Sequence, residues 1–168
     1  QLILGGFISF SLFFASNENL YSTIDNNSNI ISYISTASIS LPFIANGFID
    51  LTMIIYIPLI IIIIMATSNA INLTDGLDGL ATGLTAICTI VFALLAYASS
   101  RLDFSNYLNI IFIPYSGELF IFCFALIGSC IGFLWFNANP AKIFMGDVGS
   151  LSLGAAIGTL AILLKKEI

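Results

Sequence analysis

Four long stretches without a charged residue dominate this sequence of 168 residues. They cover residues 51–73, 80–100, 119–136 and 148–164, and none contains Lys, Arg, Asp or Glu. Because a helix rises 1.5 Å per residue, about 20 apolar residues cross a hydrocarbon core about 30 Å thick. Charged residues make up 8% of the chain, whereas soluble domains carry roughly 25%. We therefore predict an all-α polytopic membrane protein with four full transmembrane helices.

The first fifty residues are predicted to hold one truncated helix and one extramembrane loop. Residues 2–15 are apolar but supply only about half of a full span. Residues 16–50 are rich in Asn, Ser and Thr, which places them outside the lipid. Within this loop, residues 20–25 and 30–35 resemble strands on either side of an Asn-Asn-Ser-Asn cluster. That pattern predicts a small extramembrane hairpin.

Alternation of the spans decides which connections share a face of the membrane. Loops 16–50 and 101–118 are expected on one face, and turns 74–79 and 137–147 on the other. These two turns hold most of the polar residues that are unusual for a membrane protein. Although about sixty residues separate them, they can therefore form one site.

Composition excludes several classes of chemistry. The chain has a net charge of −5 with four Lys and Arg, so it has no basic patch for a nucleic acid. It has no histidine, which removes His metal ligands, His general bases and Ser-His-Asp triads within these residues. Cys88, Cys123 and Cys130 lie in apolar runs and are expected to be small buried hydrophobic residues.

The first polar turn lies in residues 68–80, which read SNAINLTDGLDGL. Asn69, Asn72, Asp75 and Asp78 are spaced three residues apart, so neighbours lie side by side while the row drifts around the helix. Carboxylates at the end of a membrane helix are kept mainly where they line a wet cavity or bind a ligand. The alternative is structural, with Asp75 or Asp78 capping the next helix.

The second polar turn lies in residues 133–150, which read FLWFNANPAKIFMGDVGS. Gly146 and Asp147 directly precede an apolar helix, where free amides and a partial positive charge favour a phosphate. A carboxylate at that position suits Mg²⁺ bridging the phosphate, although Asp147 could instead be a simple N-cap. Asn137 adds a neutral hydrogen-bonding group, and the ring of Phe144 could stack on a base or sugar.

Together the two turns predict a site for a phosphorylated ligand beside the lipid. Oxygen ligands without His or thiolate favour Mg²⁺ or Mn²⁺ over Zn²⁺. A divalent cation would also offset the repulsion among the three acids. Phosphoryl transfer is the natural chemistry of such a site, because it needs charge neutralisation and alignment.

At these two turns the chain resembles the polyprenyl-phosphate sugar-1-phosphate transferases, the glycosyltransferase 4 superfamily. The likeness lies in residues 68–84, SNAINLTDGLDGLATGL, and in residues 133–155, FLWFNANPAKIFMGDVGSLSLGA. It is strongest to the phospho-N-acetylmuramoyl-pentapeptide transferase branch. The resemblance implies that undecaprenyl phosphate attacks UDP-N-acetylmuramoyl-pentapeptide. The products would be UMP and lipid I, an intermediate of peptidoglycan synthesis in cell wall biogenesis.

The resemblance also implies roles for individual residues. Asp147 would hold Mg²⁺, and Asp75 and Asp78 would form the acidic turn that activity requires. With Asn69 added from the row of polar residues, the expected substrate-binding residues are Asn69, Asn72, Asn137, Phe144 and Gly146.

Other parts of the family pattern are not in this chain. An adjacent aspartate pair, a lysine in an earlier loop and a histidine-rich motif would fall before Gln1 and after Ile168. We therefore expect residues 1–168 to be one integral membrane domain within an enzyme of about ten helices, inactive alone. A homodimer is a further expectation.

The resemblance implies the bacterial inner membrane and a cytoplasmic active site. The charges point the other way, because Arg101, Lys165 and Lys166 lie opposite the acidic turns, whereas only Lys142 lies with them. The cytoplasmic assignment rests on the place where nucleotide-sugars are made.

Two other functions are compatible with the same residues. One is a related transferase that accepts UDP-N-acetylglucosamine. The other is a cation transporter or channel in which Asp75, Asp78 and Asp147 line an ion path. Carboxylates at helix ends, instead of at mid-membrane, argue against the second.

Overall fold

Helices make up most of the computed structural model, which describes residues 1–14, 21–24, 30–35, 37–40 and 48–166. The elements in chain order are α1 (Leu2–Phe14), β1 (Tyr21–Ile24), β2 (Ile30–Ile34), β3 (Ser38–Ser40), β4 (Phe48–Asp50), α2 (Met53–Thr74), α3 (Leu80–Ser99), α4 (Leu102–Leu108), α5 (Ser116–Asn137) and α6 (Gly146–Leu163). Among the described residues, four helices, α2, α3, α5 and α6, are long and apolar enough to cross a membrane. The predicted all-α polytopic class and its four spans are confirmed.

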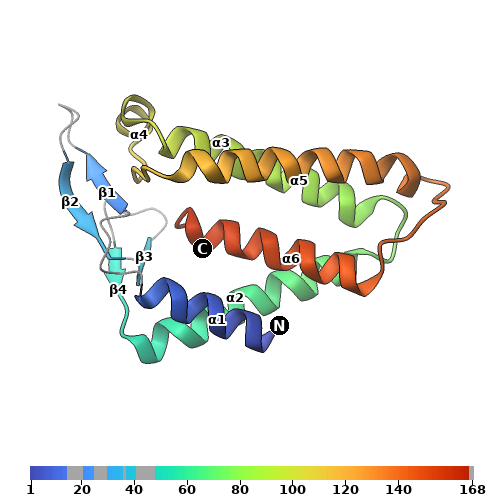
Figure 1. Cartoon of the computed structure of the whole chain (residues 1–168), viewed down its shortest axis with the longest axis horizontal. Helices are drawn as coiled ribbons and strands as arrows, with labels where there is room; N and C mark the ends of the chain where they lie inside the picture. The colour runs from blue at the N-terminus through green and yellow to red at the C-terminus, as the bar shows by residue number, and fades with distance from the viewer. Residues whose placement is uncertain (15–20, 25–29, 36, 41–47, 167–168) are drawn as a thin grey trace.

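The long helices lie side by side, with the strands at one end and the two polar turns at the other (Figure 1). Helix α3 packs along α5, α2 packs along α6, and α1 lies against α2. The turn between α2 and α3 lies at the same end as the connection between α5 and α6, as alternation of the spans predicts. The interfaces between these helices fix how the two turns meet.

Small residues allow α2 and α6 to approach closely. A Cβ added at Gly154 would lie 2.7 Å from the carbonyl oxygen of Thr67 and 2.9 Å from the backbone nitrogen of Ser68. The Ser68 hydroxyl donates a hydrogen bond of 2.8 Å to the carbonyl oxygen of Leu151. Such contacts are typical of membrane helices, where small residues and interhelical hydrogen bonds replace the hydrophobic effect between helices.

The interface between α3 and α5 is built differently, from buried small and branched side chains. Ala93 of α3 packs with Cys123 and Ile127 of α5 in one cluster of buried residues, which Leu160 of α6 joins. Cys123 and Cys130 are buried as expected, whereas Cys88 is exposed on α3. The expectation of burial was therefore wrong for Cys88, because the apolar run around it turns one face away from the protein.

The segment predicted to lie outside the lipid contains the predicted hairpin and a second pair of strands. Strands β1 and β2 pair antiparallel, with Tyr21 opposite Ile34. A second pair, β3 and β4, places Ser38 opposite Asp50 and was not predicted. The backbones of Ser22 and Phe112 exchange hydrogen bonds of 3.1 and 3.0 Å, which join the hairpin to the segment between α4 and α5. The two loops predicted to share a face therefore touch.

Helix α4, within the predicted loop 101–118, was also not foreseen. It is seven residues long, too short for a periodic pattern to stand out. Arg101 precedes it and lies over the rings of Tyr97 and Phe104, at 5.9 and 5.6 Å from their centroids. Part of the positive charge at this end is thus held against aromatic rings.

Lys165 ties the C-terminal end of α6 to the strands. Its side chain is 1% exposed. Its ammonium donates a hydrogen bond of 2.7 Å to the carbonyl oxygen of Ser38 and lies 4.8 Å from the centre of the Tyr21 ring. The Tyr21 hydroxyl in turn donates to the carbonyl oxygen of Leu163 at 3.1 Å. Lys165, one of the few charged residues of the chain, is therefore an internal link between α6 and the strands.

Replacement of Gly154 by Ala tests the α2–α6 contact. The added methyl group would meet the backbone of α2, so we expect the free energy of unfolding to fall by about 1–3 kcal/mol. Thermal unfolding of the detergent-solubilised protein measures this. Gly128→Ala on α5 is the matched control, because a Cβ there meets no atom within 4 Å. Equal stability of the two variants would contradict the close approach.

Candidate functional site

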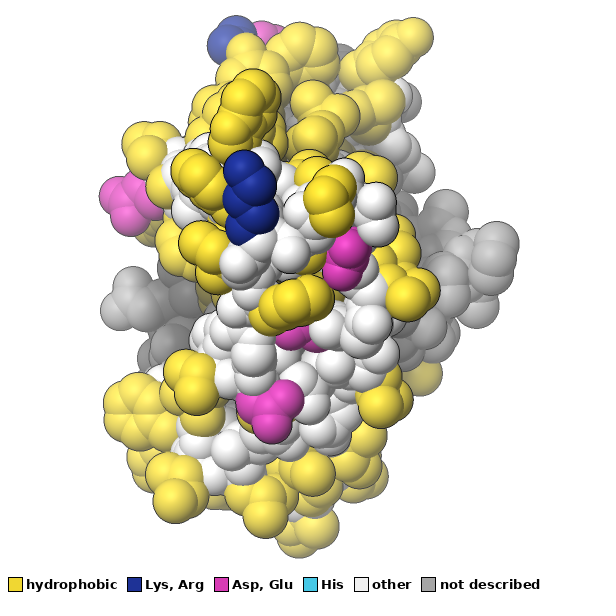
Figure 2. Space-filling view, turned by 90° about the vertical axis from the view of Figure 1, so that its right-hand side faces the viewer, with side chains coloured by type: hydrophobic (Ala, Val, Ile, Leu, Met, Phe, Trp, Pro, Cys, Tyr) yellow, Lys and Arg dark blue, Asp and Glu magenta, His cyan; other side chains and the backbone are white. Residues whose placement is uncertain are grey.

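The site lies at the end of the molecule opposite the strands. Figure 2 looks onto this end and shows acidic side chains and a basic side chain among polar and backbone atoms, with hydrophobic side chains between them and around the edge. Asp75, Asp78, Lys142 and Asp147 are in the two turns that form this end. A polar face framed by apolar side chains is what the membrane–water boundary requires.

Asp78 holds the two turns together. Its Oδ2 atom accepts a hydrogen bond of 3.1 Å from the side-chain nitrogen of Asn139 and another of 3.1 Å from the backbone nitrogen of Ala141. A carboxylate that accepts from backbone and amide donors makes a strong, charge-assisted contact. The predicted meeting of the two turns is therefore direct, and a side chain expected to be catalytic makes the contact.

Asn137 is the second link between the turns and is 2% exposed. Its Oδ1 atom accepts from the backbone nitrogen of Gly79 at 3.1 Å and from the Thr82 hydroxyl at 3.3 Å. Its Nδ2 atom donates to the carbonyl oxygen of Ile143 at 2.8 Å. Because both ends of the amide are engaged, Asn137 shapes the loop in this structure, and its contact with substrate stays a prediction.

Gly79 shows why the first turn contains glycine. Its φ of +72° lies in the left-handed region, and a Cβ would come within 3.2 Å of the Leu134 side chain. Gly146, with a φ of +70°, opens α6 in the same region, but a Cβ there would meet no atom within 4 Å. The backbone at Gly146 is therefore accessible from outside, as a ligand contact would need.

The polar residues spaced three apart on α2 contact two different parts of the chain. The Asn69 side-chain oxygen accepts from the Gln1 side chain at 3.2 Å. One turn later, the Asn72 Oδ1 atom accepts from the Ser150 hydroxyl of α6 at 2.6 Å. The row drifts around the helix as predicted, which separates Asn69 from the contact with α6.

The other two aspartates remain available to a ligand. Asp75 is half-buried at the end of α2, and Asp147 is exposed in the first turn of α6. Within the described part of the chain, neither carboxylate makes a hydrogen bond or ion pair. The N-caps of α3 and α6 are Gly79 and Met145, and neither helix has a side-chain cap. The simple capping alternative is thus not what the structure shows.

A metal at this end would have to take some ligands from a substrate. Among the described residues, no group of three His, Cys, Asp or Glu side chains lies close enough to hold a metal. The three aspartates therefore do not form a cage by themselves. Mg²⁺ is commonly held by one or two carboxylates together with substrate phosphates and water. The exposed carboxylate of Asp147 beside the open backbone of Gly146 fits that manner of binding.

The aromatic residue expected near a base is available. Phe144 is 63% exposed in the loop before α6. Lys142 is also exposed, and its backbone nitrogen donates to the carbonyl oxygen of Phe136 at 2.9 Å, which tightens the loop. The Phe144 ring can therefore be reached by a planar group from outside the protein.

Sequence reasoning missed two residues that organise the site, Ser150 and Thr82. Both are 0% exposed. Their hydroxyls reach the side chains of Asn72 and Asn137, respectively. Ser150 is three residues after Asp147, a spacing that could have indicated that it lies on the same side of α6.

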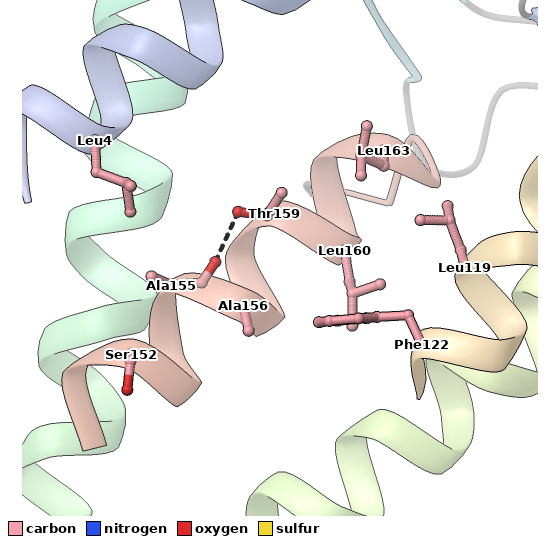
Figure 3. Close-up of a pocket in the computed structure, with 9 residues that line it drawn as sticks. All are labelled: Leu4, Leu119, Phe122, Ser152, Ala155, Ala156, Thr159, Leu160 and Leu163. Carbon is pink, nitrogen blue, oxygen red and sulfur yellow. Dashed lines mark hydrogen bonds between the residues drawn. The ribbon is translucent and has the colours of Figure 1, made fainter. Parts of the chain in front are cut away.

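An apolar groove lies between α1, α5 and α6 (Figure 3). It has a volume of about 430 Å³, and nearly all of its lining is hydrophobic. Its two hydroxyl side chains are those of Ser152 and Thr159. Both donate to carbonyl oxygens of their own helix, at 2.7 and 2.8 Å. The groove therefore offers surface for apolar groups and no chemistry.

The fold and site define a multi-pass membrane protein with a candidate ligand site where its helices end at one face. The family model described as Glycosyl transferase family 4 matches residues 7–165. The chain belongs to this family.

Three curated relatives, each named phospho-N-acetylmuramoyl-pentapeptide-transferase, extend the comparison. The protein of Thermodesulfovibrio yellowstonii is 53% identical over 79% of this chain and 37% of its own length. That of Desulfosudis oleivorans is 57% identical over 67% of this chain and 32% of its own length. That of Brachyspira hyodysenteriae is 42% identical over 100% of this chain and 45% of its own length. This chain thus spans less than half of these relatives, and their names do not favour the channel or UDP-N-acetylglucosamine alternatives.

Asn137→Ala tests the link between the turns. It would leave the Gly79 nitrogen and the Ile143 oxygen without their partner, so we expect a loss of about 2 kcal/mol or more in the free energy of unfolding. We also expect faster hydrogen exchange in residues 138–145. Asn139→Ala is the control, because Asn139 is exposed and loss of its hydrogen bond to Asp78 leaves the bond between Ala141 and Asp78 intact. Equal exchange in both variants would argue against this role for Asn137.

Proposed function

We propose that this chain is part of a phospho-N-acetylmuramoyl-pentapeptide transferase. The donor would be UDP-N-acetylmuramoyl-pentapeptide, and the acceptor would be undecaprenyl phosphate. One observation carries the proposal. The two turns are bonded to each other through Asp78 and Asn137, whereas the carboxylates of Asp75 and Asp147 at the same end have no protein partner among the described residues. Two turns held in place by hydrogen bonds, with two carboxylates left without a partner among the described residues, suit the binding of a charged substrate together with a cation.

The reaction is the transfer of one phosphoryl-sugar unit. An oxygen of undecaprenyl phosphate attacks the phosphorus that bears the sugar, and a new phosphorus–oxygen bond forms. The bond from that phosphorus to the bridging oxygen breaks, and UMP leaves with that oxygen. Lipid I keeps the sugar and its peptide. Negative charge must be neutralised throughout, because both reactants are anionic.

Asp147 and Gly146 would receive the diphosphate. Mg²⁺, when bound, would neutralise phosphate charge and hold the donor in line for attack. Asp147 would hold it through its free carboxylate. The first amides of α6 point out of the helix start and carry a partial positive charge, which favours a phosphate oxygen. The open space at Gly146 allows that approach.

The remaining residues of the site would bind other parts of the donor. Phe144 would stack on the uracil ring, and Asn72 would donate a hydrogen bond to an anionic oxygen. Asp75, half-buried beside Asn72, would take part in the acidic turn that activity requires. Asp78 would act by keeping the loop before α6 in place. Asn69 lies one helical turn before Asn72 and is hydrogen-bonded to Gln1, so it would lie at the edge of the site.

The rest of the active site would come from parts of the protein outside this chain. We therefore propose that residues 1–168 alone are inactive. The polar turns would face the cytoplasm of the bacterial inner membrane, because UDP-sugars are made there. A homodimer would be the assembled state.

Release of UMP tests the proposed function. The complete protein in detergent would be given undecaprenyl phosphate with either UDP-N-acetylmuramoyl-pentapeptide or UDP-N-acetylglucosamine. We expect UMP with the first donor and little with the second. Turnover with only the second donor would assign the chain to another branch, and ion flux across proteoliposomes that contain the complete protein, without any donor, would favour a channel.

Asp147→Asn tests the role of the free carboxylate. Losing a contact that neutralises charge in the transition state commonly costs about 10²–10³-fold in kcat, and we expect a loss of this size. Asp103→Asn is the control, because Asp103 is exposed on α4 at the opposite end. Wild-type kcat in Asp147→Asn would remove Asp147 from the mechanism.

A further inference from the structure

Ser150 is a buried hydroxyl with a partner in the candidate site. It is 0% exposed, and its Oγ atom donates a hydrogen bond of 2.6 Å to the Asn72 Oδ1 atom. We propose that Ser150 is a positioning residue that orients Asn72 so that its amide nitrogen binds a phosphate oxygen of the nucleotide-sugar. This inference rests on the proposed function and adds a residue that sequence reasoning did not identify.

The hydroxyl is drawn away from the bond that a helical serine ordinarily makes. Serine within a helix usually donates to a carbonyl oxygen one turn earlier. That oxygen, of Gly146, lies 3.1 Å from Ser150 Oγ, and the Asp147 carbonyl oxygen lies at 3.4 Å. The contact with Asn72 is shorter than both. A separation of 2.6 Å is typical of an O–H···O hydrogen bond and is shorter than an N–H···O bond, so the oxygen of the Asn72 amide, and not its nitrogen, faces the Ser150 hydroxyl.

That orientation leaves a donor for the ligand. A side-chain amide has an oxygen that accepts and a nitrogen that donates, and rotation by 180° exchanges them. With the oxygen committed to Ser150, the nitrogen stays available. Within the described residues the Asn72 nitrogen makes no hydrogen bond, and the side chain is half-buried. The half-buried Asn72 N–H group can donate to a phosphate oxygen. The negative charge of the nearby carboxylates would be offset by a cation bound together with the phosphate.

The surrounding contacts keep the pair in register. Ser68 bonds the Leu151 carbonyl oxygen, and Gly154 lies against the backbone of α2. Asn72 precedes Asp75 by three residues, and Ser150 follows Asp147 by three. The bond between Asn72 and Ser150 therefore connects the two helix ends that carry the free aspartates.

The test measures donor binding and turnover of the complete protein. Ser150→Ala, Asn72→Ala, the double variant and Asn72→Asp are compared with wild type. UDP-N-acetylmuramoyl-pentapeptide is varied at saturating undecaprenyl phosphate and Mg²⁺, and binding of UDP is measured separately by calorimetry. Ser152→Ala is the matched control, because Ser152 is exposed on the same helix and bonds only carbonyl oxygens of α6.

We expect Ser150→Ala to raise KM for the donor about three- to tenfold and to leave kcat within about twofold, because it weakens binding in the ground and transition states alike. Asn72→Ala should raise KM at least as much, and adding Ser150→Ala to it should cause no further increase. Asn72→Asp keeps an acceptor for Ser150 but removes the donor, so donor KM should rise more than tenfold. Ser152→Ala should match wild type.

Two results would overturn this role for Ser150. One is an unchanged donor KM in Ser150→Ala. The other is the same fold-increase from Ser150→Ala whether residue 72 is Asn or Ala, which would make the effect structural. If Ser150→Ala does not fold, wild-type KM in Asn72→Asp would overturn the proposal by itself. Failure of the wild-type protein to release UMP would instead refute the proposed function.

Discussion

In a membrane, a polar group must find its partner within the protein, and this constraint shapes the whole chain. Along the spans, hydroxyl side chains satisfy themselves locally, as Thr85 and Thr89 do with carbonyl oxygens one turn earlier at 2.7 Å. Hydrogen bonds between distant segments gather at the two ends of the bundle. One end carries the strands and Lys165, and the other carries Asp75, Asp78 and Asp147. The separation of apolar and polar parts leaves little room for a ligand site elsewhere.

At the polar end, aspartates that look alike in the sequence differ in their contacts. Asp78 and Asn137 are engaged with the facing turn, whereas the carboxylates of Asp75 and Asp147 make no hydrogen bond or ion pair among the described residues. The engaged pair fixes the distance between the helix ends, and the free pair can then meet a ligand without rearrangement. Preorganised groups of this kind contribute most when charge develops in a reaction.

Much of this arrangement could be predicted from the sequence, for identifiable reasons. The length of the stretches without charged residues predicts the spans. Alternation of the spans brings the turns at 74–79 and 137–147 to one face. The partner of Asp78 could not be predicted, because it depends on how α3 and α5 pack. Strands β3 and β4 are three residues each, too short to leave a pattern. The burial of Lys165 depends on Ser38, which lies 127 residues earlier in the chain. Ser150 was missed because a serine in a helix start is ordinarily only a polar surface residue.

Helix α6 is held at both ends, and this links the strands to the site. Near its start, Ser68 and Asn72 bond to Leu151 and Ser150. Near its end, Tyr21 bonds to Leu163 and Lys165 bonds to Ser38. Leu151 and Leu163 are twelve residues apart, about 18 Å along the helix axis, so these contacts lie near opposite ends of the span. A helix bound only at its start could slide or tilt, and Asp147 would move with it. Anchoring at the far end restrains that motion, which gives the extramembrane strands a part in positioning a carboxylate on the other side of the membrane.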